Sequence, residues 1–382
     1  MPNATRLALF LDGTWNVRFD NTNVWRLKSL CDENSDQLCY YSEGVGTQYG
    51  SKILGGLIGL GIDDEIARAY EWLVDNYVDQ ARIYIFGFSR GAFTARSVAG
   101  LISRCGILRR GSPLGFAQLY DRYRKGTTVP SILHISKQDP KDLDGEDRWL
   151  QKYSRAVPVH FQGVWDTVGA LGIPVGHWKA ISSSWSSFLE TDLHINDANA
   201  YHALAIDEHR QKFRPTLWVR TIEKGKPARD PRPLTQVEQR WFVGAHSDVG
   251  GGYSNGLLAQ RPLKWLMDKA VLHGLQFAGS VELDGDEVKA PIHDSYRDMF
   301  HGWRRILQPT RYFRTTGADA LEIGDSVTTS INETIDGSVF SRWRGDPEYR
   351  PPNLHGWAVR RSIDISSLQT AVLAADPMVV VT

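Results

Sequence analysis

Residues 82–102, RIYIFGFSRGAFTARSVAGLI, hold the pattern from which the fold of this chain can be inferred. They predict a buried strand at 83–86, a tight turn at 87–91 and a helix packed through small side chains. A serine at the centre of a G-x-S-x-G turn between a strand and a helix is typical of a nucleophile elbow, because so sharp a reversal needs the glycines for close packing. Ser89 is therefore the candidate nucleophile, and a plain turn with a buried hydroxyl is the alternative.

The rest of the chain repeats the alternation of strands and helices. A helix is expected from Asp63, a suitable N-cap, because apolar residues recur after it at helical spacing. A further helix is expected over residues 197–213. Apolar runs predict the other strands at residues 7–11, 37–42, 157–165 and 239–244. This order predicts an α/β fold of the α/β-hydrolase type, with a doubly wound, mostly parallel sheet and helices on both faces.

Two helical or loop insertions are expected in this fold, at about residues 106–155 and 170–195. The second insertion is predicted to contain an amphipathic helix whose apolar stripe is formed by Trp178, Ile181, Trp185 and Phe188. This helix could act as a lid, bind an acyl chain or pack on the core. Residues 1–275 are expected to form the catalytic domain. Residues 276–382 are expected to be irregular and to pack on the same domain.

A serine nucleophile needs a base and a carboxylate that orients the base. Asp166 and His246 each follow a predicted strand, as Ser89 does, and the carboxyl ends of parallel strands meet at one edge of a sheet. The chain order Ser, Asp, His is also that of the α/β-hydrolase fold. Asp248 and His293 are the alternative carboxylate and base.

Backbone N–H groups beside Ser89 could stabilise an oxyanion formed during acyl transfer. One candidate is the N–H of Arg90, at the start of the helix that follows the elbow. The others are those of Gly13 and Thr14, in the loop after the first strand. A plain Asp-Gly turn is the alternative interpretation of that loop.

The composition bounds the function. Lys plus Arg and Asp plus Glu both total 44, so the formal charge is zero and nucleic-acid binding is not expected. The three cysteines predict neither a disulfide framework nor a metal site, and the chemistry needs no cofactor. No Sec signal and no run of eighteen apolar residues is apparent, which favours a cytoplasmic location or export without a Sec signal, and no transmembrane segment.

Several long motifs together resemble one family: FLDGTWN, IFGFSRGAFTAR, GVWDTVGALG, HALAIDEHR and GAHSDVGGGY, in that order over residues 6–270. They resemble the α/β-hydrolase catalytic domain of type VI secretion lipase effectors, long catalogued as a domain of unknown function. The resemblance implies a catalytic triad of Ser89, Asp166 and His246. It also implies a phospholipase and a type VI-like route of export, but it identifies no particular secretion or immunity partner.

The expected function is therefore that of a serine esterase or lipase. Its expected substrate is an ester or a lipid. Peripheral contact with a membrane is compatible with the aromatic stripe of the second insertion. One rival is an esterase for small esters or polyesters. The other is a non-catalytic interaction module on a hydrolase scaffold, because fold alone does not guarantee activity.

Overall fold

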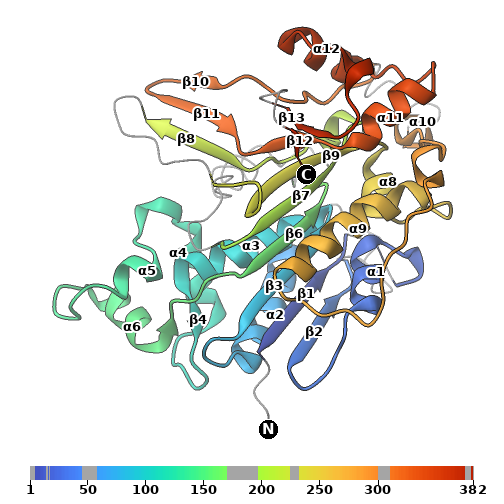
Figure 1. Cartoon of the computed structure of the whole chain (residues 1–382). Coiled ribbons are helices and arrows are strands. Elements are labelled where there is room, and N and C mark those ends of the chain that lie inside the picture. Colours follow the sequence, from blue (N-terminus) through green and yellow to red (C-terminus); the bar gives the residue numbers. More distant parts are fainter. Residues whose placement is uncertain are drawn as a thin grey trace.

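A nine-stranded sheet forms the centre of the molecule (Figure 1). The computed structural model describes residues 5–13, 16, 18–44, 58–169, 197–223, 232–299, 310–374 and 380–381. From edge to edge the strands are β14 (Val380–Val381), β13 (Ala371–Leu373), β12 (Glu333–Ile335), β9 (Val237–Phe242), β7 (Ala200–Ala205), β6 (Phe161–Trp165), β3 (Arg82–Phe88), β1 (Arg6–Leu11) and β2 (Gln37–Ser42). Adjacent strands from β12 to β2 run parallel to each other. Strand β13 pairs antiparallel with both β12 and β14. The predicted mostly parallel α/β sheet is confirmed.

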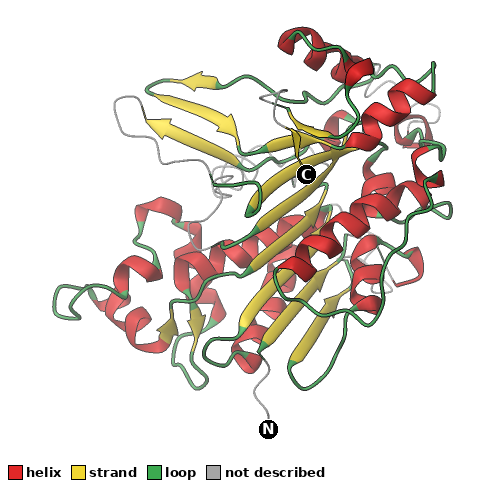
Figure 2. Ribbon diagram, viewed as in Figure 1, coloured by secondary structure: helices red, strands yellow, loops and turns green. Residues whose placement is uncertain are grey.

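Helices cover both faces of this sheet (Figure 2). Ile83 and Ile85 of β3 belong to the core shared with α2 (Ile58–Asn76) and α3 (Arg90–Cys105). Their neighbours Tyr84 and Phe86 lie in the opposite core, with α1 (Asn23–Leu30) and α9 (Leu257–Leu272). A strand buried on both faces is apolar along its whole length, which is why β1 and β3 could be predicted from continuous apolar runs.

The C-terminal region is more regular than expected, so the prediction of irregular structure over residues 276–382 was wrong. It contributes β12, β13 and β14 to the main sheet, and its helices are α10 (Ser295–Met299), α11 (Gly337–Gly345) and α12 (Pro352–Arg361). Phe340 and Trp357 form a third core with Trp241 of β9. Strands of two or three residues are too short for a side-chain period to reveal them. The boundary near residue 275 stays a prediction.

A small second sheet lies beside the main one. It pairs β10 (Leu321–Ile323), β11 (Ser326–Ser330) and β8 (Val219–Glu223) in antiparallel fashion. Short 3-10 helices in the described part of the chain are η1 (Arg18–Asp20), η2 (Gly126–Thr128), η4 (Gln211–Phe213), η5 (Asp286–Val288) and η7 (Ile365–Ser367).

The first insertion, residues 106–155, forms a helical unit beside α3. Its elements are β4 (Ile107–Leu108), α4 (Phe116–Arg124), α5 (Ile132–Ile135), α6 (Gly145–Tyr153) and β5 (Ser154–Arg155). Strands β4 and β5 pair antiparallel and bring the two ends of the insertion together. The second insertion, with Trp178, Ile181, Trp185 and Phe188, lies outside the described residues.

The range 197–213, predicted as a helix, instead contains the strand β7 and, further along, the short helix η4, so that prediction was wrong. All six residues of β7 are buried between β6 and β9. Apolar and alanine-rich segments are ambiguous between helix and strand, and here the sheet on either side decides. Helix α2 also begins at Ile58, five residues before the Asp63 predicted as its N-cap.

Glycine is required at the elbow because two backbones nearly touch there. A Cβ atom on Gly91 would lie 2.2 Å from the carbonyl oxygen of Leu11. We expect Gly91→Ala to lower the free energy of unfolding by about 3 kcal/mol, because strand and helix would have to move apart. Urea denaturation followed by tryptophan fluorescence measures this change.

The matched control is Gly145→Ala in α6, where a Cβ atom would meet nothing within 4 Å. That variant should keep its stability or gain up to about 1 kcal/mol, because alanine favours helix. Equal losses in the two variants would contradict the close-approach argument.

Candidate active site

Ser89 sits in a strained turn between β3 and α3. Its backbone has φ 57° and ψ −119°, in a region that residues with side chains rarely adopt. The Ser89 N–H donates to the carbonyl of Trp165 at the end of β6, and the Ser89 carbonyl accepts from the Phe93 N–H of α3. Contacts on both sides therefore hold the serine in this conformation, in which its side chain is largely buried.

A hydrogen-bonded chain links Ser89 to His246 and Asp166. The Ser89 Oγ lies 2.8 Å from His246 Nε2, and His246 Nδ1 lies 2.5 Å from Asp166 Oδ2. These residues follow β3, β9 and β6, so the carboxyl ends of three strands bring them to one edge of the sheet. With the Nδ1 proton directed at the carboxylate, Nε2 is the acceptor that faces the serine hydroxyl.

The alternative residues Asp248 and His293 form a separate pair. His293 Nδ1 lies 2.6 Å from Asp248 Oδ1, and the imidazole stacks on Tyr253 with ring centroids 3.8 Å apart. The other oxygen of Asp248 accepts from the backbone N–H groups of His293 and Ala245. Asp248 thus fixes the loop that leads into α8 (His246–Gly250) and presents His246.

Arg314 completes the surroundings of Asp166 and was missed by the sequence analysis. Its guanidinium grips both carboxylate oxygens, with Nη1 2.6 Å from Oδ1 and Nη2 2.9 Å from Oδ2. It also donates to the carbonyls of Ala205 and Phe213, and its side chain is fully buried. An isolated arginine in a segment without periodic pattern carries no signal of such a role, so only the tertiary structure reveals it.

The surroundings of His246 favour its neutral form at neutral pH. Burial by itself would raise the pKa of Asp166, but Arg314 and His246 together hold it well below its ordinary value. Burial lowers the pKa of His246, and the hydrogen bond to Asp166 opposes this effect only in part. A neutral imidazole beside an ionised carboxylate is therefore the expected state at neutral pH.

One family matches the larger part of the chain. Residues 5–269 match the family described as "T6SS, Phospholipase effector Tle1-like, catalytic domain". The chain belongs to this Tle1-like family. The resemblance inferred from the sequence motifs is thereby confirmed. Arg314 lies beyond the residues that match the Tle1-like catalytic domain, although it contacts Asp166 within them.

Other similar proteins are more distant. The uncharacterized protein YEL023C of Saccharomyces cerevisiae is 28% identical over 215 residues, which are 50% of this chain and 29% of that protein. A crystal structure of an uncharacterized protein from Pseudomonas aeruginosa has a TM-score of 0.46 at 18% identity, covering 79% of this chain and 51% of that one. The Tle1 effector bound to the VgrG spike of the type 6 secretion system has a TM-score of 0.36 at 18% identity, covering 66% and 51%.

The chain therefore spans less than a third of the yeast relative and about half of the two structural relatives. The fold of this chain follows from its sheet topology, not from these TM-scores.

Two of the three oxyanion candidates can be placed in the structure. Arg90 is the first residue of α3, so its N–H lies at the positive end of the helix, next to Ser89. Gly13 also lies beside the serine, because a Cβ atom there would be 3.3 Å from Ser89 Cβ. Its N–H, however, donates to Asp12 Oδ1 at 2.8 Å, so Gly13 as an oxyanion donor is not supported in this state. Thr14 lies outside the described residues.

A second buried carboxylate supports the backbone of His246. Glu208 Oε2 accepts from the His246 N–H at 3.2 Å and from the Ser295 hydroxyl at 2.9 Å. Burial would raise the pKa of Glu208, but Arg210 lowers it to about 2, so this carboxylate is ionised. The imidazole of His246 lies between two rings, with Phe88 and Phe213 centroids at 4.6 and 5.0 Å.

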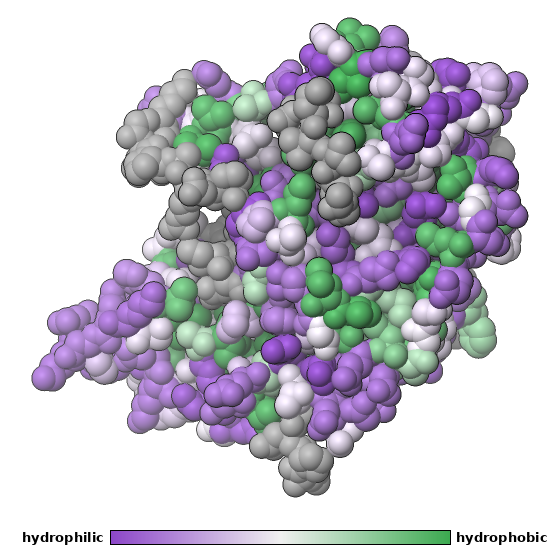
Figure 3. Space-filling model, in the orientation of Figure 1, coloured by the Kyte–Doolittle hydropathy of each residue, from purple (hydrophilic) through white to green (hydrophobic). Residues whose placement is uncertain are grey.

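Neither a metal nor a membrane span emerges from the described part of the chain. Within it, no group of three or more His, Cys, Asp and Glu side chains could hold a metal ion. Among the same residues, none of the helices combines the length and the apolar character needed to cross a bilayer. On the face shown in Figure 3, hydrophobic residues form separate small groups within a mainly hydrophilic surface.

Proposed function

We propose that this chain is a serine hydrolase that cleaves carboxylic ester bonds in lipids, with phospholipids as its substrate class. The observation that carries the proposal is the hydrogen-bonded chain Ser89–His246–Asp166, which starts at a strained elbow. Membership in a phospholipase effector family supports the choice of a lipid ester. Export through a type VI-like route belongs to the same proposal.

In the first half of the reaction, His246 Nε2 takes the hydroxyl proton as Ser89 Oγ attacks the ester carbonyl carbon. The negative charge that develops on the carbonyl oxygen is stabilised by the N–H of Arg90 and the start of α3. His246 then gives its proton to the departing alcohol oxygen, which leaves an acyl group on Ser89. Asp166 orients His246 and stabilises the imidazolium that forms.

In the second half, a water molecule replaces the alcohol. His246 removes a proton from this water as its oxygen attacks the acyl carbonyl, and the proton returns to Ser89 Oγ when the fatty acid leaves. The net reaction is addition of water across one ester bond. No redox step occurs, and the serine ends in its starting state.

A fluorophosphonate probe tests the proposal directly, because it forms a bond only with an activated serine. We expect the folded protein to be labelled on the peptide that contains Ser89, as read by mass spectrometry. Ser89→Ala should remain unlabelled. The control Ser97→Ala, which alters a buried serine two helical turns further along α3, should label like the wild type.

The substrate class is tested with phosphatidylglycerol vesicles and with p-nitrophenyl esters from acetate to palmitate. Cleavage of phospholipid and long esters supports the proposal. A preference for acetate without phospholipid cleavage would indicate an esterase for small esters. A folded wild type that is neither labelled nor active would overturn the proposal in favour of a non-catalytic interaction module.

A further inference from the structure

The motif HALAIDEHR, residues 202–210, holds the loop that presents His246. Two neighbouring carboxylates of the motif lie just after β7 and accept hydrogen bonds from that loop. Asp207 Oδ2 accepts from the Gly244 N–H at 2.7 Å, and Glu208 Oε2 accepts from the His246 N–H at 3.2 Å. The motif therefore fixes the backbone of His246 and of a residue shortly before it.

The last residue of the motif, Arg210, connects Glu208 to the imidazole of His246. Its Nε and Nη2 donate to the two oxygens of Glu208, both at 2.8 Å. Its guanidinium also lies over the Phe213 ring, 3.5 Å from the centroid. That ring packs edge-on against the imidazole of His246, with centroids 5.0 Å apart and planes at 74°. Arg210 thus links the group that holds the backbone of His246 to the group that packs on its ring.

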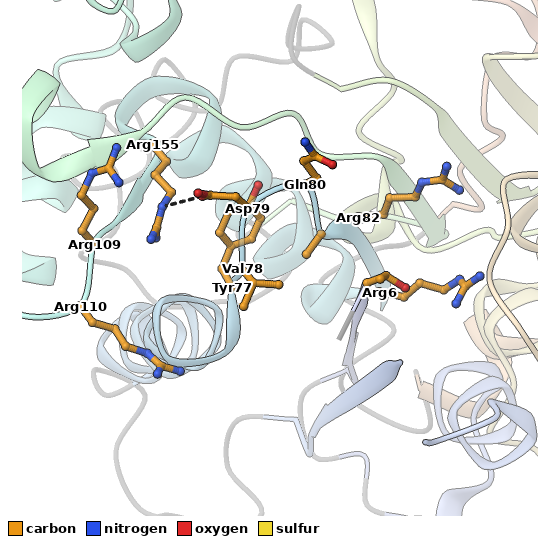
Figure 4. A pocket seen from close by; sticks show the side chains of 11 residues that line it. Arg6, Tyr77, Val78, Asp79, Gln80, Arg82, Arg109, Arg110 and Arg155 are labelled. Atoms are coloured by element: carbon orange, nitrogen blue, oxygen red, sulfur yellow. Dashed lines mark ion pairs between the residues drawn. The ribbon is translucent and has the colours of Figure 1, made fainter. Parts of the chain in front are cut away.

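The arginines at the other end of the sheet are arranged differently (Figure 4). They line a cavity of about 820 Å3 near the starts of β1 and β3. Arg155 Nε lies 3.1 Å from Asp79 Oδ1, whereas Arg6 and Arg82 extend away from that pair. Those arginines therefore do not converge on one partner, whereas Arg210 joins two contacts of a single histidine.

The charged and titratable groups around His246 come from several elements: Asp166, Glu208, Arg210, Asp248, His293 and Arg314. Burial has the largest effect on the pKa of His246 and lowers it, while Asp166 raises it. Arg210 lowers this pKa further and Glu208 raises it. Removing either member of the pair alone should therefore move the titration of His246, and the two removals should act in opposite directions.

We propose that the segment 208–213 positions the imidazole of His246, through the side chains of Glu208, Arg210 and Phe213. A carboxylate and a guanidinium joined by two hydrogen bonds have a fixed relative geometry, so the pair can hold an aromatic ring in one place. The side chains of Glu208 and Arg210 are 0% and 10% exposed, so solvent screens their charges little. Their role rests on the proposed function, because the place of His246 matters only if this histidine transfers a proton.

NMR titration of the His246 imidazole in the Ser89→Ala protein tests the charge balance without relying on activity. In Arg210→Met a cation is lost, so the titration midpoint of His246 should rise by at least about 0.3 pH units. In Glu208→Gln an anion is lost, so the midpoint should fall. Arg210→Lys keeps the charge and should titrate close to the starting protein. Unchanged midpoints, or shifts in the same direction for Arg210→Met and Glu208→Gln, would overturn the proposal.

The double variant Glu208→Gln/Arg210→Met guards against loss of folding. It removes both charges, so no unpaired ion is left buried. The midpoint of His246 in this variant should lie between those of the two single variants. A midpoint outside that interval would contradict the balance of two opposite charges.

Initial rates on a p-nitrophenyl ester test the packing of Phe213. Phe213→Leu should lower kcat at least about fivefold and leave KM within about twofold, because support of the imidazole is lost and not substrate binding. A higher KM with unchanged kcat would show that the ring binds substrate, which contradicts a positioning role. A wild type that cleaves no ester would count against the proposed function alone, since the NMR midpoints are read in Ser89→Ala.

The matched control is the pair Glu238 and Arg240 of β9, which has the same two-residue spacing. Arg240 Nε donates to Glu238 Oε1 at 2.7 Å, and its guanidinium lies 5.3 Å from the centroid of the Trp265 ring. Arg240→Met should lower the free energy of unfolding, as Arg210→Met does, but leave the midpoint of His246 unchanged and kcat within about twofold. Equal effects of the two arginine variants on His246 would show that the loss of any buried ion pair disturbs the site, which contradicts the proposal.

Discussion

Replacing His246 with alanine is expected to lower kcat/KM for ester hydrolysis by about 10⁴-fold or more, whereas His293→Ala should change it less than tenfold. His246 Nε2 lies 2.8 Å from Ser89 Oγ, so its loss removes the acceptor of the serine proton. His293 instead pairs with Asp248, at 2.6 Å. The measurement is the initial rate on a p-nitrophenyl ester that the wild type cleaves.

The two histidine variants act as controls for each other, because each removes an imidazole that is hydrogen-bonded to a buried aspartate. Circular dichroism and thermal unfolding should show that both remain folded. The double variant Ser89→Ala/His246→Ala should be no less active than the single variants, because residues that act as one unit are not additive. An inactive His293→Ala beside an active His246→Ala would instead assign the base to His293.

Replacing Arg314 with methionine is expected to lower the free energy of unfolding by about 3 to 5 kcal/mol at neutral pH. The change leaves the carboxylate of Asp166 buried without the cation that grips both its oxygens. The pKa of Asp166 in the folded protein is held far below its ordinary value, so its ion pair stabilises the fold above the unfolded pKa of about 4. The loss should therefore shrink as the pH falls and Asp166 becomes protonated, which urea denaturation at several pH values measures.

The same variant should shift the pH profile of kcat/KM. Because burial lowers the pKa of His246, the acid limb of the wild-type profile is expected to have its midpoint below 6.5. Removing the positive charge of Arg314 raises the proton affinity of the coupled pair Asp166 and His246, so the midpoint should move to higher pH. Arg314→Lys, which keeps the charge but not the two-pronged contact, should show a smaller shift.

Arg122→Met is the matched control for this shift. Arg122 is also buried, and it pairs with Glu146 at 2.9 Å and Asp147 at 2.6 Å in the first insertion. Its replacement should cost stability without moving the midpoint of the pH profile. If the two variants shifted the midpoint equally, Arg314 would be a structural residue and not one that positions the triad.

Much of the fold could be predicted because its signals are local. The parallel strands are buried on both faces, so they stand out as apolar runs. The elbow after β3 has a five-residue pattern in which the two glycines are required because a Cβ atom there would clash with the backbone. The predicted α/β class and the family are confirmed. Elements with weak local signals could not be predicted: β7 is alanine-rich and buried, and β12 to β14 are very short.

The sequence by itself determined which residues could carry the chemistry, since Ser89, Asp166 and His246 each follow a strand and the ends of parallel strands meet at one edge. The sequence did not decide between His246 and His293 as the base, or between Asp166 and Asp248 as the carboxylate. Only the tertiary structure decided which of them lie within hydrogen-bond distance of Ser89, and only it placed Arg314 on Asp166, 148 residues away in the chain. A contact between residues so far apart in the chain depends on the packing of the whole fold, and it produces no pattern in the sequence around either residue.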